Sequence, residues 1–132
     1  MIYISKQTSQ EIEDITLVQG ESIQLFGKQG YTVSQLQSIN KLLEMNDCTI
    51  CIDCDLGTSN ENEDLIHNLS VIEFLSNVRH LLVSNFPYKA ELDSIDFVQY
   101  TPLLQSLSIL GLVKRSISLQ PLQKLKVLDT LN

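Results

Sequence analysis

The sequence predicts an α/β fold, a short irregular solenoid with parallel strands on one face and helices on the other. One phrase of apolar residues occurs three times, at residues 78–83, 104–109 and 122–127, and the last two steps of each copy have the period of a half-buried strand. The copies are not joined by tight hairpin turns, which favours parallel strands connected by crossovers. The positions between the apolar residues are mostly polar, which favours helices on only one side of the sheet.

Residues 1–47 are expected to form an N-terminal capping region of strands and one helix, within a single domain that spans residues 1–132. Three short segments have the composition of strands: Ile2–Ile4, Ile15–Val18 and Ile23–Phe26. Apolar residues at spacings of three and four predict a helix from Val33 to Leu43, with Thr32 or Ser34 as its N-cap. Such a helix has one apolar face, which we expect to pack on the sheet.

Residues 48–132 are expected to form repeat-like strand–helix units. Alternating residues predict a strand from Cys48 to Leu56, and helical spacing predicts a helix over 65–75 and a weaker one over 92–98. The third apolar positions of successive strands align as follows: Leu25, Ile52, Val83, Ile109 and Val127. The chain stops directly after the last strand, so we expect its C-terminal end to be truncated or covered by a partner, because solenoids need a polar cap.

The closing run of residues 117–128, I-S-L-Q-P-L-Q-K-L-K-V-L, has apolar residues at every third position leading into the last strand. Together with the repeated phrase, it makes the stretch from Val78 to Leu131 resemble the leucine-rich repeat family, in the irregular form found in bacterial proteins. The resemblance implies a right-handed curved solenoid of strand-plus-helix units. The family usually places a hydrogen-bonding asparagine three residues after the third apolar position, where this chain has Asp55, Phe86, Leu112 and Thr130. A regular horseshoe is therefore not expected.

Composition and charge indicate a globular cytoplasmic protein. The formal net charge is −7, with the acidic residues concentrated in the first half, and this argues against a nucleic-acid surface, which needs clustered Lys and Arg. No segment approaches the roughly 18 apolar residues of a membrane span, so we expect no membrane partner. The first residues lack a secretory signal, and three cysteines in one short stretch do not form a disulfide framework.

The residue types that could carry chemistry are not arranged for it by their spacing, so we expect no enzyme, no cofactor and no metal. Cys48, Cys51 and Cys54 have the spacing C-x-x-C-x-x-C of some metal sites, but residues three apart on a strand face opposite ways. We therefore interpret them as small side chains that fill a strand. His67 and His80 have no nucleophile and acid arranged by spacing, and both are interpreted as surface residues.

What remains is the exposed face of the sheet, formed by the residues between the apolar anchors. Large apolar side chains on a solvated strand face often mark a contact surface. We therefore predict a non-catalytic protein–protein interaction module that binds another protein through this face. The residues expected to bind the partner are His80, Leu82, Ser84, Ser106, Ser108, Leu110, Lys124, Lys126 and Leu128.

Four alternatives stay open at this point. Alternating strands and helices also fit a compact three-layer α/β domain that acts as a small enzyme or ligand-dependent regulator. The resemblance to bacterial repeat proteins also makes an inhibitor or immunity-type protein a further possibility. Finally, the C-terminal end near Val127 could mediate homo-oligomerisation, or the exposed leucines could be covered by other segments of the same chain.

Overall fold

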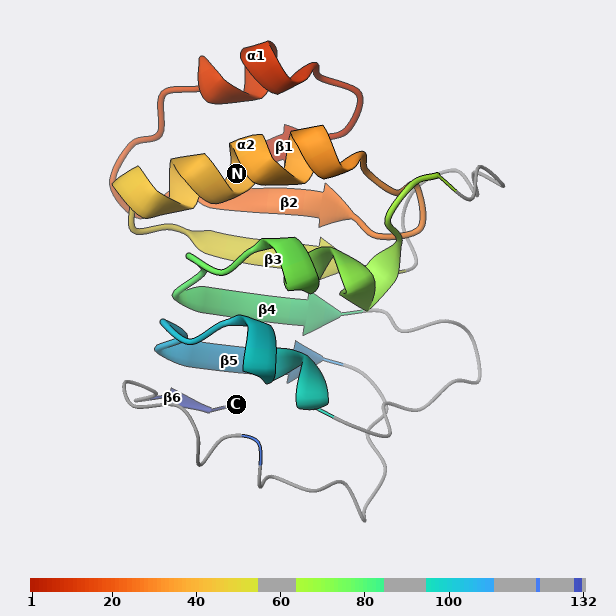
Figure 1. The fold of residues 1–132 in the computed structure, drawn as a ribbon. Coiled ribbons are helices and arrows are strands. Elements are labelled where there is room, and N and C mark those ends of the chain that lie inside the picture. Colours follow the sequence, from red (N-terminus) through yellow and green to blue (C-terminus); the bar gives the residue numbers. More distant parts are fainter. Residues whose placement is uncertain (55–63, 85–94, 111–120, 122–129, 132) are drawn as a thin grey trace.

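A computed structural model shows an α/β fold built on one parallel sheet (Figure 1). It describes residues 1–54, 64–84, 95–110, 121 and 130–131. The strands are β1 (Ile2–Ile4), β2 (Ser22–Phe26), β3 (Thr49–Asp53), β4 (His80–Ser84), β5 (Ser106–Leu110) and β6 (Thr130–Leu131). Their order in the sheet follows their order in the chain, and each strand is parallel to the next. The predicted parallel sheet is confirmed.

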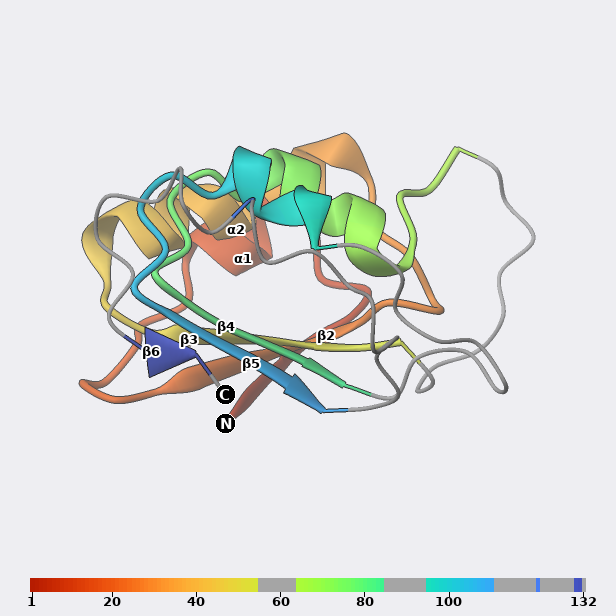
Figure 2. The same ribbon diagram turned by 90° about the horizontal axis from the view of Figure 1, so that it is seen from below.

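The helices of the described residues all lie on the same side of this sheet (Figure 2). They are α1 (Ser9–Glu13), α2 (Val33–Met45) and two short 3₁₀ helices, η1 (Asn68–Phe74) and η2 (Asp96–Tyr100). The described elements therefore form two layers, and the core lies between them. Along this part of the chain, no helix has the length and apolar composition needed to cross a bilayer.

The strand register agrees with the predicted alignment of apolar anchors for four strands. Leu25 pairs with Ile52, Ile52 with Val83, and Val83 with Ile109. The fifth anchor, Val127, lies outside the described residues. Within β6, Leu131 pairs with Leu107, where the alignment had placed Leu125.

The prediction of the last strand was therefore wrong in its register. The physical reason is that leucine occurs at every third position of this segment, so several alignments of the strand place a leucine opposite Leu107. These leucines are Leu119, Leu122, Leu125, Leu128 and Leu131.

The segment between β1 and β2 differs from the prediction. Ile15–Val18 was expected to be a strand, but it has no regular secondary structure; Ile15 and Leu17 pack against the core from a loop. The helix α1 was not predicted. Its N-terminus has a capping box in which the Glu11 amide donates to Thr8 Oγ1 and the Thr8 amide donates to Glu11 Oε1, each at 3.2 Å. The sequence T-x-x-E at this position was a signal for it.

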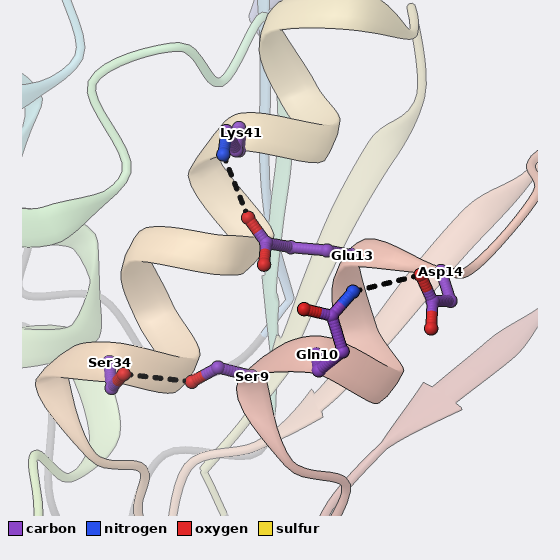
Figure 3. Close-up of polar contacts among 6 residues, drawn as sticks. All are labelled: Ser9, Gln10, Glu13, Asp14, Ser34 and Lys41. Atoms are coloured by element: carbon purple, nitrogen blue, oxygen red, sulfur yellow. Dashed lines mark hydrogen bonds and ion pairs between the residues drawn. The ribbon is translucent and has the colours of Figure 1, made fainter.

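The helix α1 packs beside α2, and polar side chains of the two helices are in contact (Figure 3). Ser9 Oγ donates to Ser34 Oγ at 2.8 Å, and Lys41 Nζ lies 2.9 Å from Glu13 Oε1. Ile12 of α1 is fully buried in the core. The helix α2 itself is confirmed, and Thr32 is the residue that caps it, with a second capping box to Gln35.

The helix predicted over residues 65–75 begins three residues later and is a 3₁₀ helix. Ile66 instead forms an antiparallel bridge with Tyr31, with amide–carbonyl bonds of 2.9 and 2.7 Å. Asn68 then adopts a left-handed backbone conformation, with φ of 52°, that ends this extended segment. The weaker helix predicted over 92–98 corresponds to η2, although residues 92–94 lie outside the described part.

The Tyr31 side chain connects β1 and β2 to the segment just before α2 through hydrogen bonds. Its ring is fully buried, and its hydroxyl donates to the Ile4 carbonyl at 2.5 Å and accepts from the Phe26 amide at 2.7 Å. Burial raises the pKa of the Tyr31 phenol well above its ordinary value. The hydroxyl is therefore a neutral structural group at all physiological pH values.

Candidate functional site

The side chains that point away from the helices form a surface that we call the outer face. Along each strand they alternate with the buried anchors, and the parallel register places them in rows. The first row contains Ser22, Thr49, His80 and Ser106. The second contains Tyr3, Gln24, Cys51, Leu82 and Ser108, and the third contains Phe26, Asp53, Ser84 and Leu110.

The structure brings six of the nine predicted partner-binding residues together on this face. Their pairs across β4 and β5 are His80 with Ser106, Leu82 with Ser108, and Ser84 with Leu110. All six are at least partly exposed, and Leu110 has 56% of its surface exposed. The other three, Lys124, Lys126 and Leu128, lie outside the described residues.

An aromatic pair at the opposite end of the outer face was missed by the sequence analysis. The rings of Tyr3 and Phe26 stack with their centroids 6.1 Å apart and their planes 16° from parallel, and Tyr3 is 58% exposed. The signal was present in the alternation of β1 and β2, because Tyr3 precedes the buried Ile4 and Phe26 follows the buried Leu25. The outer face therefore carries apolar groups at both ends, with aromatics on β1 and β2 and leucines on β4 and β5.

The side chains in the middle of the outer face are less exposed than those at its ends. On β3, Cys51 is 7% exposed and Asp53 is 6% exposed, although both alternate with the core anchors. Asp53 is therefore a buried carboxyl-bearing residue on a face whose other polar side chains are partly exposed. Asp53 pairs in the sheet with Phe26 of β2 and with Ser84 of β4, and the Gly27 amide donates to the Asp53 backbone carbonyl at 2.9 Å.

A chain of hydrogen bonds crosses the first row of the outer face. His80 Nδ1 lies 2.8 Å from Ser106 Oγ, and His80 Nε2 lies 2.9 Å from Asp47 Oδ1. Spacing along the sequence did not reveal this arrangement, which comes from the register of β4 with β5 and from the position of Asp47. Asp47 comes from the linker before β3, where strand alternation gives no indication of its direction. The two polar neighbours together hold the imidazole ring in one orientation.

This hydrogen-bonded chain borders an open pocket of about 330 Å³. The pocket is lined by the turn Gln19–Glu21 and by Asp47, Cys48, Thr49 and His80. In the neutral tautomer protonated at Nε2, His80 donates to the Asp47 carboxylate and accepts the Ser106 hydroxyl proton at Nδ1. The Asp47 side chain is 65% exposed, so this pair is largely screened by water.

The three cysteines are buried and have no disulfide partner among themselves. Cys48 and Cys54 belong to the core, whereas Cys51 lies on the outer face, as the strand alternation predicted. Burial, and secondarily the neighbouring carboxylates of Asp47 and Asp53, raises the pKa of Cys48 and of Cys54 to about 11. At neutral pH these thiols are protonated and unreactive.

Within the described ranges, no group of three or more His, Cys, Asp or Glu residues is placed to hold a metal ion. Comparison with family models, with curated proteins and with solved structures found no match.

Proposed function

We propose that this chain is a protein–protein interaction module without catalytic activity, a short right-handed solenoid of the leucine-rich-repeat type that binds another protein through its outer face. The observation that supports it most directly is the pair of apolar ends on a strand face that no described helix covers. Parallel sheets are normally covered on both faces. A parallel sheet with one open, partly apolar face is therefore suited to being covered by a partner.

The arrangement of the strands supports the solenoid. Each strand is hydrogen-bonded to the strands that precede and follow it in the chain, so every unit contacts its sequence neighbours. Helices on one side only are the expected consequence of crossovers that all have the same hand.

The two ends of the outer face would supply different parts of the binding energy. The stacked rings of Tyr3 and Phe26 are rigid, so covering them costs little side-chain entropy. Leu110 exposes more than half of its surface, and fully burying a leucine contributes about 1.5–3 kcal/mol. Beside them, the hydroxyl groups of Ser22 and Thr49 in the first row would offer hydrogen bonds that fix the partner's orientation.

The experiment is partner capture with Leu110→Glu, compared with wild type and with Met45→Glu. Met45 is 79% exposed at the end of α2 and is not on the outer face, so it controls for a new surface carboxylate. We expect mass spectrometry to identify a protein captured by wild type and by Met45→Glu, and Leu110→Glu to weaken its purified complex at least about tenfold. Equal affinity for wild type and Leu110→Glu, with both folded, would show that the outer face is not the binding site.

Several finer features belong to the same proposal. The partner surface would extend to Lys124, Lys126 and Leu128, and the C-terminal end of the sheet would be covered by a partner or by a second copy. A cytoplasmic location is compatible with three free buried thiols. An inhibitor or immunity-type role would be one biological use of such a binding module.

A second candidate function, a small hydrolase, is favoured by the chain from Asp47 through His80 to Ser106. In such a reaction Ser106 Oγ would attack an ester carbonyl, His80 Nδ1 would take its proton and return it to the leaving alkoxide, and water would later release the acyl group. It ranks second because the Ser106 amide already donates to the Arg79 carbonyl at 3.0 Å and is not available to stabilise an oxyanion.

A fluorophosphonate probe tests this second function. A hydrolase predicts covalent labelling of Ser106 in wild type, located by peptide mass spectrometry, and loss of labelling in His80→Gln. Absence of labelling in folded wild-type protein would leave the binding module as the only function proposed.

A further inference from the structure

The first strand of the sheet, β1, has an outer edge that a side chain of the same protein occupies. Among the described residues, β1 pairs with β2 alone. On the other side, the Ser5 amide donates to Gln7 Oε1 at 2.6 Å, and Gln7 Nε2 donates to the Tyr3 carbonyl at 2.9 Å. A single carboxamide therefore satisfies one donor and one acceptor of the β1 edge.

These two bonds have the pattern of a parallel strand pair. In a parallel ladder, one residue of the neighbouring strand donates its N–H to a carbonyl and accepts from the N–H two residues further along. Tyr3 and Ser5 stand in this relation, and the Gln7 side chain has the same amide chemistry as a peptide unit. The carboxamide thus takes the place of one residue of a missing neighbouring strand.

The position of Gln7 is fixed by the beginning of α2. Gln35 Nε2 donates to the Gln7 carbonyl at 2.8 Å and to the Ser5 carbonyl at 3.2 Å. The oxygen of the same Gln35 carboxamide accepts from the Thr32 amide at 2.8 Å as part of the capping box. The turn that carries Gln7 is therefore hydrogen-bonded to the N-terminal end of α2.

We propose that Gln7 is an edge cap, which closes β1 against strand addition by a second copy of the chain. An open strand edge is a template for pairing with another chain. Because all strands are parallel and follow the chain order, β6 of a second copy could continue the sheet at β1 in the same direction. Such a head-to-tail contact does not close on itself and can propagate. The Gln7 carboxamide occupies the Ser5 amide and the Tyr3 carbonyl, the backbone groups that an added β6 strand would need.

The test compares the sedimentation of four full-length proteins over a dilution series: wild type, Gln7→Ala, Gln7→Lys and Gln10→Ala. Gln10 is exposed and donates to Asp14, remote from the edge, so it is the matched control. Gln7→Ala opens the edge, and we expect its average mass at least to double with rising concentration relative to wild type. Gln7→Lys also removes the amide but places a charge at the edge, so we expect it to sediment like wild type.

Three outcomes would overturn the proposal. Gln7→Ala could sediment like wild type, which would make Gln7 a tether of the turn only. Gln7→Ala and Gln7→Lys could associate equally, which would indicate general destabilisation rather than an open edge. Finally, the Ser5 amide of wild type could exchange its hydrogen as fast as a free amide, whereas the cap predicts at least about fivefold slower exchange, the factor that one net hydrogen bond supplies. This last measurement needs no variant to fold.

Discussion

The hydroxyl of Tyr31 provides a direct test of how the first two strands are held. Tyr31→Phe keeps the fully buried ring and removes the oxygen that donates to Ile4 and accepts from Phe26. A buried polar group that loses its partner costs about 1–3 kcal/mol. We therefore expect Tyr31→Phe to lower the free energy of unfolding by about 2 kcal/mol.

The expected change in melting temperature follows from the size of the chain. Unfolding entropy of about 2.1 cal/mol/K per residue gives about 0.28 kcal/mol/K for 132 residues, so a loss of about 2 kcal/mol corresponds to about 7 °C. Thermal and urea unfolding followed by circular dichroism measure both quantities. Tyr3→Phe is the matched control, because the Tyr3 ring is 58% exposed and keeps its stacking on Phe26. If Tyr31→Phe costs less than about 0.5 kcal/mol, the range of ordinary surface changes, the hydroxyl does not fasten these strands.

Three further predictions concern stability. The unfolding free energy should fall as pH rises from about 9 to about 11, because the thiols of Cys48 and Cys54 have a pKa of about 11 in the folded protein but ionise near their ordinary pKa when unfolded. Urea unfolding at a series of pH values measures this decrease. In the double variant Cys48→Ala, Cys54→Ala, the unfolding free energy should fall less steeply with pH. Thr32→Ala should cost about 1 kcal/mol by removing the α2 cap, whereas Ser34→Ala should cost less than half of that, as measured by urea unfolding. Gly27→Ala should cost about 1–3 kcal/mol, because a Cβ there would lie 3.0 Å from the Asn68 Cα, and an unchanged melting temperature would contradict this close packing.

The sequence was most informative where burial repeats at every second residue. The anchors Leu25, Ile52, Val83 and Ile109 were aligned correctly, because a shift of one residue would move each strand's apolar side chains out of the core. The same pattern placed His80 beside Ser106 and Leu82 beside Ser108. Register and outer-face neighbours are thus readable from alternation alone.

Features that do not depend on apolar periodicity were missed. The helix α1 is only five residues long and buries Ile12 alone, so no helical stripe marks it. Asp47 reaches His80 from a linker, and Gln7 meets the β1 edge through a side-chain amide. Both are polar contacts whose direction depends on the completed fold, which hydrophobic patterning does not encode.

The edge cap and the outer face together indicate how a partner would be recognised. The structure satisfies backbone groups at β1 with Gln7, but it leaves the side chains of Tyr3 and Leu110 more than half exposed. Recognition by strand addition would need the β1 backbone, whereas recognition by side-chain packing would need the outer face. We therefore expect Gln7→Ala to leave partner affinity within about twofold of wild type, a change below about 0.5 kcal/mol, while Leu110→Glu weakens it at least about tenfold. Measured at concentrations where Gln7→Ala is monomeric, tighter binding by Gln7→Ala together with unchanged binding by Leu110→Glu would place the partner on the β1 edge and remove the outer face from the binding site.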